Sequence, residues 1–174
     1  TITIEEGKPI GDAQGEVKRA MNIMEYAAGE GRRMFGYTTP SELPNTVAYT
    51  VRRPLGVVGI ITPWNFPVLL ALWKVAPALI TGNTFVLKPT PYTPLTALRF
   101  GQIAQSVLPA GVLSVLSGGD QLGPQMTNHP DVAKISFTGS TETGKHVLRS
   151  AAGTVKRVTL ELGGNDAAIV LPDA

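Results

Sequence analysis

The chain is 174 residues long, 43% hydrophobic and 16% charged, a composition typical of a folded domain with a buried core and not of a disordered chain. Its 15 basic and 13 acidic residues leave a net charge of only +2, too small and too scattered to indicate nucleic acid or an anionic membrane as a partner. The lack of cysteine excludes disulfides, zinc ribbons and thiol catalysis within these residues, and two histidines far apart in sequence indicate no metal site.

No segment is predicted to cross a membrane. The longest apolar stretch, residues 68–80, contains Lys74 and Pro77 and is too short to span a bilayer, and no signal peptide opens the chain. We therefore expect a cytoplasmic protein. Because the chain begins without methionine and ends just after an apolar run, we also expect both ends to be cut from a longer sequence.

The first 54 residues are predicted to form a helical segment followed by a strand. Apolar residues recur at helical spacing from Val17 to Ala28, and Gly29 and Gly31 then weaken the pattern. Over residues 45–53 apolar and polar residues alternate, which predicts a half-exposed strand closed by Pro54. We place a domain boundary there, between an N-terminal segment at 1–54 and the main domain at 55–174.

From residue 55 onward, predicted strands and helices alternate. Thr93-Pro94 offers a helix N-cap followed by proline at the first helical position. The predicted strands span 56–62, 84–88, 112–117, 132–137, 155–162 and 167–171; the predicted helices span 68–81, 93–108 and 140–151, with a short one after Gly118-Gly119. Repeated βαβ units of this kind specify an α/β fold with a Rossmann-like, doubly wound parallel sheet, on which ligands bind beyond the carboxyl ends of the strands.

One glycine-rich motif follows a predicted strand and opens a predicted helix. Residues 137–144 read FTGSTETG, in which Gly139 and Gly144 have the spacing of the dinucleotide-binding pattern G-x-G-x-x-G, with Thr141 at the middle glycine. In that context backbone N–H groups can face a pyrophosphate. The alternative is an ordinary strand-to-helix turn in which Ser140 or Thr141 caps the helix.

Two further motifs follow predicted strands. Pro63-Trp64-Asn65-Phe66-Pro67 is a rigid, non-helical connection from which Asn65 could offer its amide to an oxyanion; alternatively the two aromatics cap the core and Asn65 satisfies the turn. Lys88, in Lys88-Pro89-Thr90, could reach ligand hydroxyls or phosphates. The alternative for Lys88 is a solvated lysine at the margin of the sheet.

Two charged residues lie in apolar surroundings. Lys74 is within an apolar helix, so it either extends to water or is buried with a partner. Glu161 lies in an apolar strand just before Gly163-Gly164, where partial desolvation predicts a raised pKa suited to a general base. The alternative is an edge-strand glutamate that faces water.

Taken in order, the five motifs PWNFP, KPT, GG, FTGS and ELGG resemble the coenzyme-binding and catalytic half of the aldehyde dehydrogenase superfamily over essentially the whole chain. The resemblance implies an enzyme that oxidises a small-molecule aldehyde to a carboxylic acid with NAD or NADP, through a cysteine thiohemiacetal and thioester. It also implies a homodimer or homotetramer for the full-length protein. Because the chain has no cysteine, we expect a fragment that ends before the nucleophile and is inactive alone.

The resemblance also implies roles for individual residues. Asn65 would supply the side-chain donor of the oxyanion hole, Glu161 would be the base that activates water, and Lys74 matches a lysine with a charge-relay role in some members. Lys88 would bond the adenosine ribose, and residues 45–53 resemble part of an oligomerisation arm. The other residues implied in cofactor binding are Ile61, Thr62, Pro63, Trp64, Thr90, Gly119, Gly123, Phe137, Gly139, Ser140, Leu162 and Gly163.

One position departs from the family pattern. Many members have a glutamate three residues after the lysine matched by Lys88, where it accepts both ribose hydroxyls, but this chain has Pro91. The choice between NAD and NADP therefore stays open. Two other hypotheses remain: a non-catalytic binding or scaffold homologue of the same fold, and a different Rossmann-type oxidoreductase, which is disfavoured because the chain has no Tyr-x-x-x-Lys pattern.

Overall fold

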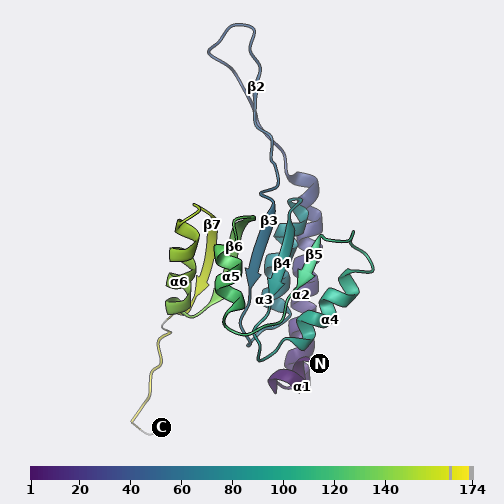
Figure 1. Cartoon of the computed structure of the whole chain (residues 1–174). Helices are drawn as coiled ribbons and strands as arrows, with labels where there is room; N and C mark the ends of the chain where they lie inside the picture. The colour runs from purple at the N-terminus through teal and green to yellow at the C-terminus, as the bar shows by residue number, and fades with distance from the viewer. Residues whose placement is uncertain (165, 173–174) are drawn as a thin grey trace.

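A five-stranded parallel sheet forms the centre of the protein in a computed structural model that describes residues 1–164 and 166–172. The strand order is β5-β4-β3-β6-β7, and Figure 1 shows helices on both faces of the sheet. The strands are β3 (Val57–Ile61), β4 (Thr84–Lys88), β5 (Leu113–Val115), β6 (Val132–Gly139) and β7 (Arg157–Leu162). The helices of this part are α3 (Leu69–Ile80), α4 (Leu95–Ala104), α5 (Leu122–Asn128) and α6 (Thr141–Ala152).

The strand order confirms the predicted doubly wound sheet. From the central β3 the chain winds outward through β4 to β5, then returns to the other side of β3 to form β6 and β7. All four strand pairs are parallel, as helical crossovers require. The direction of winding therefore reverses between β3 and β6, where such sheets leave a crevice for a ligand.

Two hydrophobic clusters lie on opposite faces of the sheet. On β3, Val58 and Ile60 pack with α2, α3 and α4, whereas Val57 and Ile61 pack toward the cluster that includes Met126 of α5. This division follows from the alternation of side chains along a strand. A strand with apolar residues at every position is thus buried on both faces, which explains the continuous apolar run at residues 56–62.

The N-terminal segment contains two helices and a long hairpin. Helix α1 (Ile2–Glu6) and helix α2 (Ile10–Glu30) are followed by the 3₁₀ turn η1 (Gly31–Arg33), and Figure 1 shows the next segment projecting far from the sheet. Within it, β1 (Thr38–Thr39) pairs antiparallel with β2 (Ala48–Tyr49). The strand predicted over 45–53 is therefore only two residues long, because a two-stranded ribbon exposed on both sides offers little to extend it.

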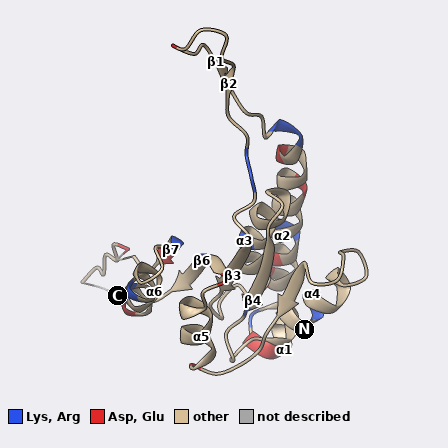
Figure 2. Cartoon of the chain, turned by 45° about the horizontal axis from the view of Figure 1, so that its top comes forward, with Lys and Arg blue, Asp and Glu red and all other residues tan. Residues whose placement is uncertain are grey.

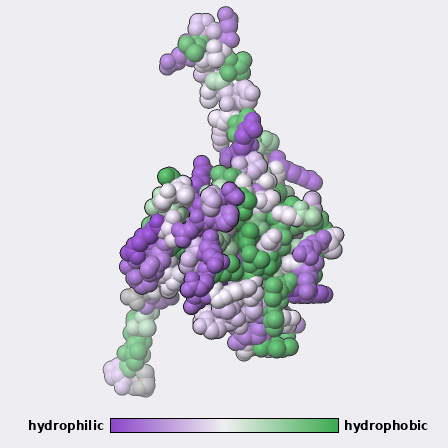
Figure 3. All heavy atoms as spheres, in the orientation of Figure 1, coloured by the Kyte–Doolittle hydropathy of each residue, from purple (hydrophilic) through white to green (hydrophobic). Residues whose placement is uncertain are grey.

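One predicted strand is absent from the structure. Residues 167–171 form no strand, and Figure 3 shows them as a hydrophobic tail that leaves the body. Ile169 is 87% exposed and Val170 is 80% exposed. The apolar pattern favours a strand, but a strand needs a hydrogen-bonded neighbour, and none lies beside this segment in the described part of the chain.

The start of α4 also differs from the prediction. Thr93 does not cap the helix; its hydroxyl instead donates to the carbonyl of Trp64. The first N–H groups of α4, those of Leu95 and Thr96, donate to the carboxylate of Glu5, at 2.7 and 3.1 Å. Figure 2 shows the acidic residues of α1 beside the start of α4. None of the helices in residues 1–164 and 166–172 is long and apolar enough to cross a membrane.

Candidate functional site

All five sequence motifs lie at one edge of the sheet. Pro63–Pro67 follows β3, Lys88 ends β4, Gly118-Gly119 follows β5, and the FTGS and ELGG motifs stand at the ends of β6 and β7. The predicted placement at the carboxyl ends of the strands is therefore confirmed. Because the strands are parallel, these ends meet at the edge where α/β sheets bind ligands.

A cleft of about 440 Å³ opens at this edge, between α5, α6 and the ends of β3, β4 and β6. Four residues from the predicted cofactor set line it together although they are far apart in sequence: Ile61, Lys88, Gly123 and Phe137. Its volume is within the range of small-molecule and cofactor sites. The cleft is also lined by residues that were not predicted to bind a cofactor, among them Asp120, Thr143, His146 and Ser150.

Lys88 is the most unusual residue in this cleft. Its side chain is largely buried, with 6% of the residue exposed, and it forms no ion pair with any described residue. Burial lowers the pKa of the Lys88 ammonium, and the nearby carboxylate of Asp120 offsets part of that effect. The alternative of a solvated lysine at the sheet margin is therefore wrong. A buried ammonium without an ionic partner is suited to bind hydroxyls or phosphates of a ligand.

The two glycines of the FTGSTETG motif have packing roles. A Cβ on Gly139 would lie 2.5 Å from the Phe137 ring, and one on Gly144 would lie 2.4 Å from a methyl of Leu162, so a side chain at either position would force its neighbour to move. The hydroxyl of Ser140 accepts from the Thr143 N–H and caps α6. The turn-and-cap alternative thus accounts for Ser140, while Gly144 performs the helix–strand packing of the third glycine in dinucleotide-binding turns.

Other members of the predicted cofactor set follow β3 and β5, and Gly123 lies in the first turn of α5. A Cβ added to Gly119 or Gly123 would meet no atom within 4 Å, which leaves room for a ligand to approach the backbone. The Thr62 hydroxyl is buried and has no hydrogen-bond partner among the described residues. Trp64 and Phe66 are exposed, so they do not cap the core as the alternative proposed.

A second cleft, of about 330 Å³, contains Lys74 and Glu161. Lys74 is buried in α3, and its Nζ lies 3.1 Å from Oε2 of Glu161 on β7, so this lysine is buried with a partner. The hydroxyl of Thr138 donates to the same oxygen at 2.7 Å. Thr138 is not among the predicted site residues, because its position beside Glu161 depends on the β6–β7 register.

The pKa of Glu161 corrects the expectation from sequence. Burial acts to raise this pKa, but the hydrogen bond from Thr138, the contact with Lys74 and the nearby Trp73 together outweigh burial and hold it below its usual value. The pKa of Glu161 was expected to be raised because only the effect of desolvation can be judged from its strand. The pKa of Lys74 is lowered as well, because burial disfavours its ammonium and the contact with Glu161 only partly offsets that effect.

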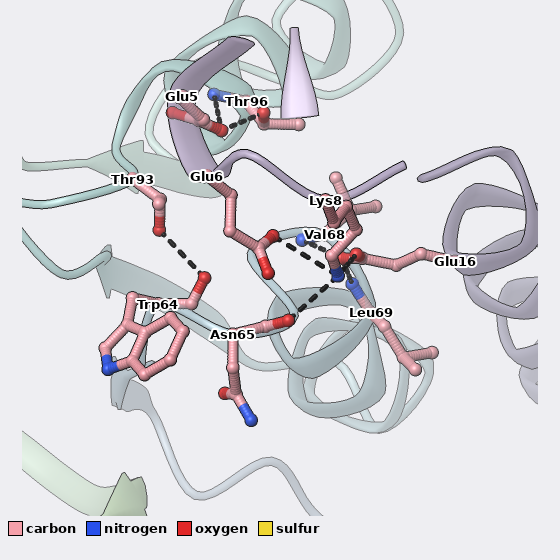
Figure 4. Close-up of polar contacts among 10 residues, drawn as sticks. All are labelled: Glu5, Glu6, Lys8, Glu16, Trp64, Asn65, Val68, Leu69, Thr93 and Thr96. Atoms are coloured by element: carbon pink, nitrogen blue, oxygen red, sulfur yellow. Dashed lines mark hydrogen bonds and ion pairs between the residues drawn. The ribbon is translucent and has the colours of Figure 1, made fainter. Parts of the chain in front are cut away.

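Asn65 lines a third cleft, apart from Lys74 and Glu161, with residues of α1 and α2 around it. Its side chain is exposed and makes no hydrogen bond with the described residues, whereas its backbone carbonyl accepts from Lys8 Nζ at 2.9 Å. Figure 4 shows the Asn65 amide pointing away from Lys8. Lys8 and Glu16 also lie beside Asn65, but they belong to none of the five motifs, so their proximity to Asn65 could not be predicted from the sequence.

The whole chain, residues 1–174, matches the aldehyde dehydrogenase family. It is 46% identical to the mitochondrial succinate-semialdehyde dehydrogenase of Arabidopsis thaliana, covering 99% of this chain and 33% of the relative. It is 42% identical to the succinate-semialdehyde dehydrogenase (NADP⁺) GabD of Escherichia coli, covering 99% of this chain and 36% of that protein. The chain thus spans about a third of the length of these relatives.

Solved structures agree with this match. The chain resembles a crystal structure of betaine aldehyde dehydrogenase from Staphylococcus aureus in complex with NAD⁺, with a TM-score of 0.90 and 39% identity over 94% of this chain and 33% of the other. At 39% identity the two chains are similar in sequence as well as in fold.

Proposed function

Because the chain belongs to the aldehyde dehydrogenase family, we propose that it is the coenzyme-binding part of an enzyme that oxidises a small-molecule aldehyde to a carboxylic acid with NAD⁺ or NADP⁺. The observation that carries the proposal is the cleft in which Ile61, Lys88, Gly123 and Phe137 converge at the carboxyl ends of three strands. A ligand site requires residues from separate elements to lie together, and these four residues come from four elements. A set of unrelated turns would not bring them into one cleft.

The cleft has features that fit a dinucleotide. The buried ammonium of Lys88 has no ionic partner among the described residues, so ribose hydroxyls could complete its hydrogen bonds. The orphaned hydroxyl of Thr62 and the open backbone at Gly123 provide further contacts along the same edge. When bound there, the nicotinamide cofactor would supply the hydride acceptor. Pro91 offers neither a ribose acceptor nor a charge against a 2′-phosphate, so we propose that both cofactors are used.

Asn65 and Glu161 would act at different moments. When a cysteine thiolate from outside these 174 residues adds to the aldehyde carbonyl, the Asn65 amide donates a hydrogen bond to the oxygen as it becomes negative. Glu161 later accepts a proton from the water that attacks the thioester. The contact with Lys74 and the hydrogen bond from Thr138 keep Glu161 ionised at neutral pH, as a proton acceptor must be.

A rapid-mixing experiment on the complete protein tests these roles. Asn65→Ala should slow the initial burst of NAD(P)H by about a hundred- to a thousandfold, the usual cost of losing one oxyanion donor. Glu161→Gln should keep a stoichiometric burst and slow the turnover that follows. A normal burst in Asn65→Ala together with wild-type turnover in Glu161→Gln would show that both assignments are wrong. A cytoplasmic location and a homodimeric or homotetrameric state stay predictions.

A further inference from the structure

We propose that Lys8 and Glu16 are positioning residues for Asn65 and act through it on the formation of the oxyanion. The inference rests on the role proposed above for Asn65. It concerns the segment of residues 62–68 between β3 and α3, here named the Asn65 loop. Lys8 and Glu16 lie in the N-terminal segment and belong to none of the five motifs at the strand ends.

Three consecutive carbonyls of the Asn65 loop are held by hydrogen bonds. Trp64 O accepts from the hydroxyl of Thr93 at 3.2 Å, and Asn65 O accepts from Lys8 Nζ at 2.9 Å. Phe66 O accepts from an N–H within α3. Because a peptide unit is planar, fixing the Asn65 carbonyl fixes the orientation of the whole unit that follows Asn65. The direction in which the Asn65 side chain leaves the backbone is then restricted.

Glu16 fixes the other end of the same loop. Its Oε1 accepts from the N–H groups of Val68 and Leu69, at 2.8 and 3.1 Å, where α3 begins. No side chain of the loop itself caps this helix. A carboxylate at a helix N-terminus forms charge-assisted hydrogen bonds and interacts favourably with the helix dipole. The first turn of α3, and with it the exit from the Asn65 loop, is therefore held by a residue 52 positions earlier in the chain.

Lys8 joins the two ends. Its ammonium has three N–H donors and lies 2.7 Å from Oε2 of Glu16, 2.9 Å from Asn65 O and 3.2 Å from Oε2 of Glu6. It also lies over the ring of Phe66, 4.2 Å from the centroid. Figure 4 shows the carboxylates of Glu6 and Glu16 and the Asn65 carbonyl converging on the Lys8 nitrogen.

The burial of Glu16 restricts the movement of Lys8 relative to the Asn65 loop. Its side chain is fully buried, and a buried carboxylate is stable only when its charge is paired and its oxygens accept hydrogen bonds. Lys8 supplies that charge, so Lys8 cannot swing away from Asn65 O without leaving Glu16 uncompensated. Lys8 contacts Asn65 only at the backbone carbonyl, which leaves the side-chain amide free for a ligand.

Burst kinetics of the complete protein test the inference through a double-mutant cycle. Lys8→Met removes the ammonium and keeps most of the apolar stem, and Glu16→Gln removes the charge and keeps an acceptor. Each is made in the wild-type and the Asn65→Ala backgrounds. Glu5→Gln is the matched control, because Glu5 caps α4 from the same N-terminal segment and makes no bond to the Asn65 loop.

In the wild-type background we expect Lys8→Met and Glu16→Gln to slow the burst by roughly tenfold to a hundredfold, the scale of a misplacement of about 1 Å. The turnover after the burst and the Kd for NAD⁺ should stay within about twofold of wild type. In the Asn65→Ala background neither substitution should slow the burst further, since the group they position is gone. Lys8→Arg, which keeps the charge, should restore part of the burst rate.

The outcomes separate this inference from the proposed function. If Asn65→Ala has a normal burst, the proposed role of Asn65 fails and the inference fails with it. If Asn65→Ala slows the burst but Lys8→Met slows it by the same factor in both backgrounds, only the inference is overturned. An equal loss in Glu5→Gln would likewise overturn it, by showing a general effect of the N-terminal segment. If Lys8→Met does not fold, the cycle is run with Glu16→Gln, and an additive effect there is equally decisive.

Discussion

The sharpest single test of the coenzyme cleft is the substitution Lys88→Met. Methionine keeps the unbranched apolar stem and removes only the ammonium. Because burial lowers the pKa of Lys88 and no described carboxylate forms an ion pair with it, the free protein carries the cost of burying this charge without an ionic partner. We therefore expect Lys88→Met to fold at least as stably as the wild type, while it binds NAD⁺ and NADP⁺ more weakly.

The size of the loss follows from the hydrogen bonds that the ammonium would donate. A hydrogen bond to a charged group contributes about 1.5–3 kcal/mol, which corresponds to an increase in Kd of roughly tenfold to a hundredfold. Asp120 should act with the opposite sign. Its carboxylate lines the same cleft and would face the phosphates of the cofactor, so Asp120→Asn should tighten binding.

Isothermal titration of the complete protein with each dinucleotide measures both effects. Lys145→Met is the matched control: Lys145 lies on α6, pairs with Glu142 at 2.7 Å and does not line the cleft. If Lys88→Met and Lys145→Met both bind NAD⁺ within about twofold of wild type, Lys88 does not contact the cofactor. A Lys88→Met protein that melts well below wild type would instead show that its ammonium has a structural partner.

Three further predictions concern cofactor choice, packing and pH. Pro91→Glu should shift the ratio of kcat/KM values toward NAD⁺ over NADP⁺ by adding a ribose acceptor that repels a 2′-phosphate, and an unchanged ratio would locate selectivity elsewhere. Gly144→Ala should leave the free energy of unfolding within about 1 kcal/mol of wild type, measured by urea unfolding against Gly153→Ala, because the methyl that an added Cβ meets is the end of the partly exposed Leu162 side chain and alanine favours the helix over glycine. Lys74→Met should raise the pKa of Glu161, because burial is then opposed by one interaction fewer, and should move the acid limb of the deacylation profile to higher pH. In the wild type the contribution of ionised Glu161 to stability is present above the pKa of an unfolded glutamate and is lost as pH falls through the lowered folded-state pKa. Because that pKa is lowered less in the variant, stability should depend less on pH in acid.

The parts of the fold predicted correctly are those specified by local pattern. The apolar run at 56–62, the alternation of strands and helices, and Ser140 as the cap of α6 each depend on residues close together in sequence. The same local reasoning predicts all five motifs at strand ends, which is where the structure has them. It fails at residues 167–171, since strand formation also depends on a neighbour that pattern cannot supply.

The electrostatic details are less accessible from sequence. The strand that contains Glu161, considered alone, predicts a raised pKa, whereas the groups that lower this pKa come from β6 and α3. Thr93 precedes a proline and is therefore expected to cap α4, but a carboxylate from α1 takes that role. In both cases the deciding partner lies many residues away, and a motif read in isolation contains no information about it.

The caps supplied by Glu5 and Glu16 have a consequence for synthesis of the chain. Glu5 bonds to Thr96, 91 residues later, and Glu16 bonds to Val68, 52 residues later. At a translation rate of roughly 5–20 residues per second, about 5–18 s pass between incorporation of Glu5 and of Thr96. Throughout that interval Glu5 has no α4 to cap, whereas α3, against which α2 packs, is complete at Ile80, so the native contacts of α1 should form later than those of α2.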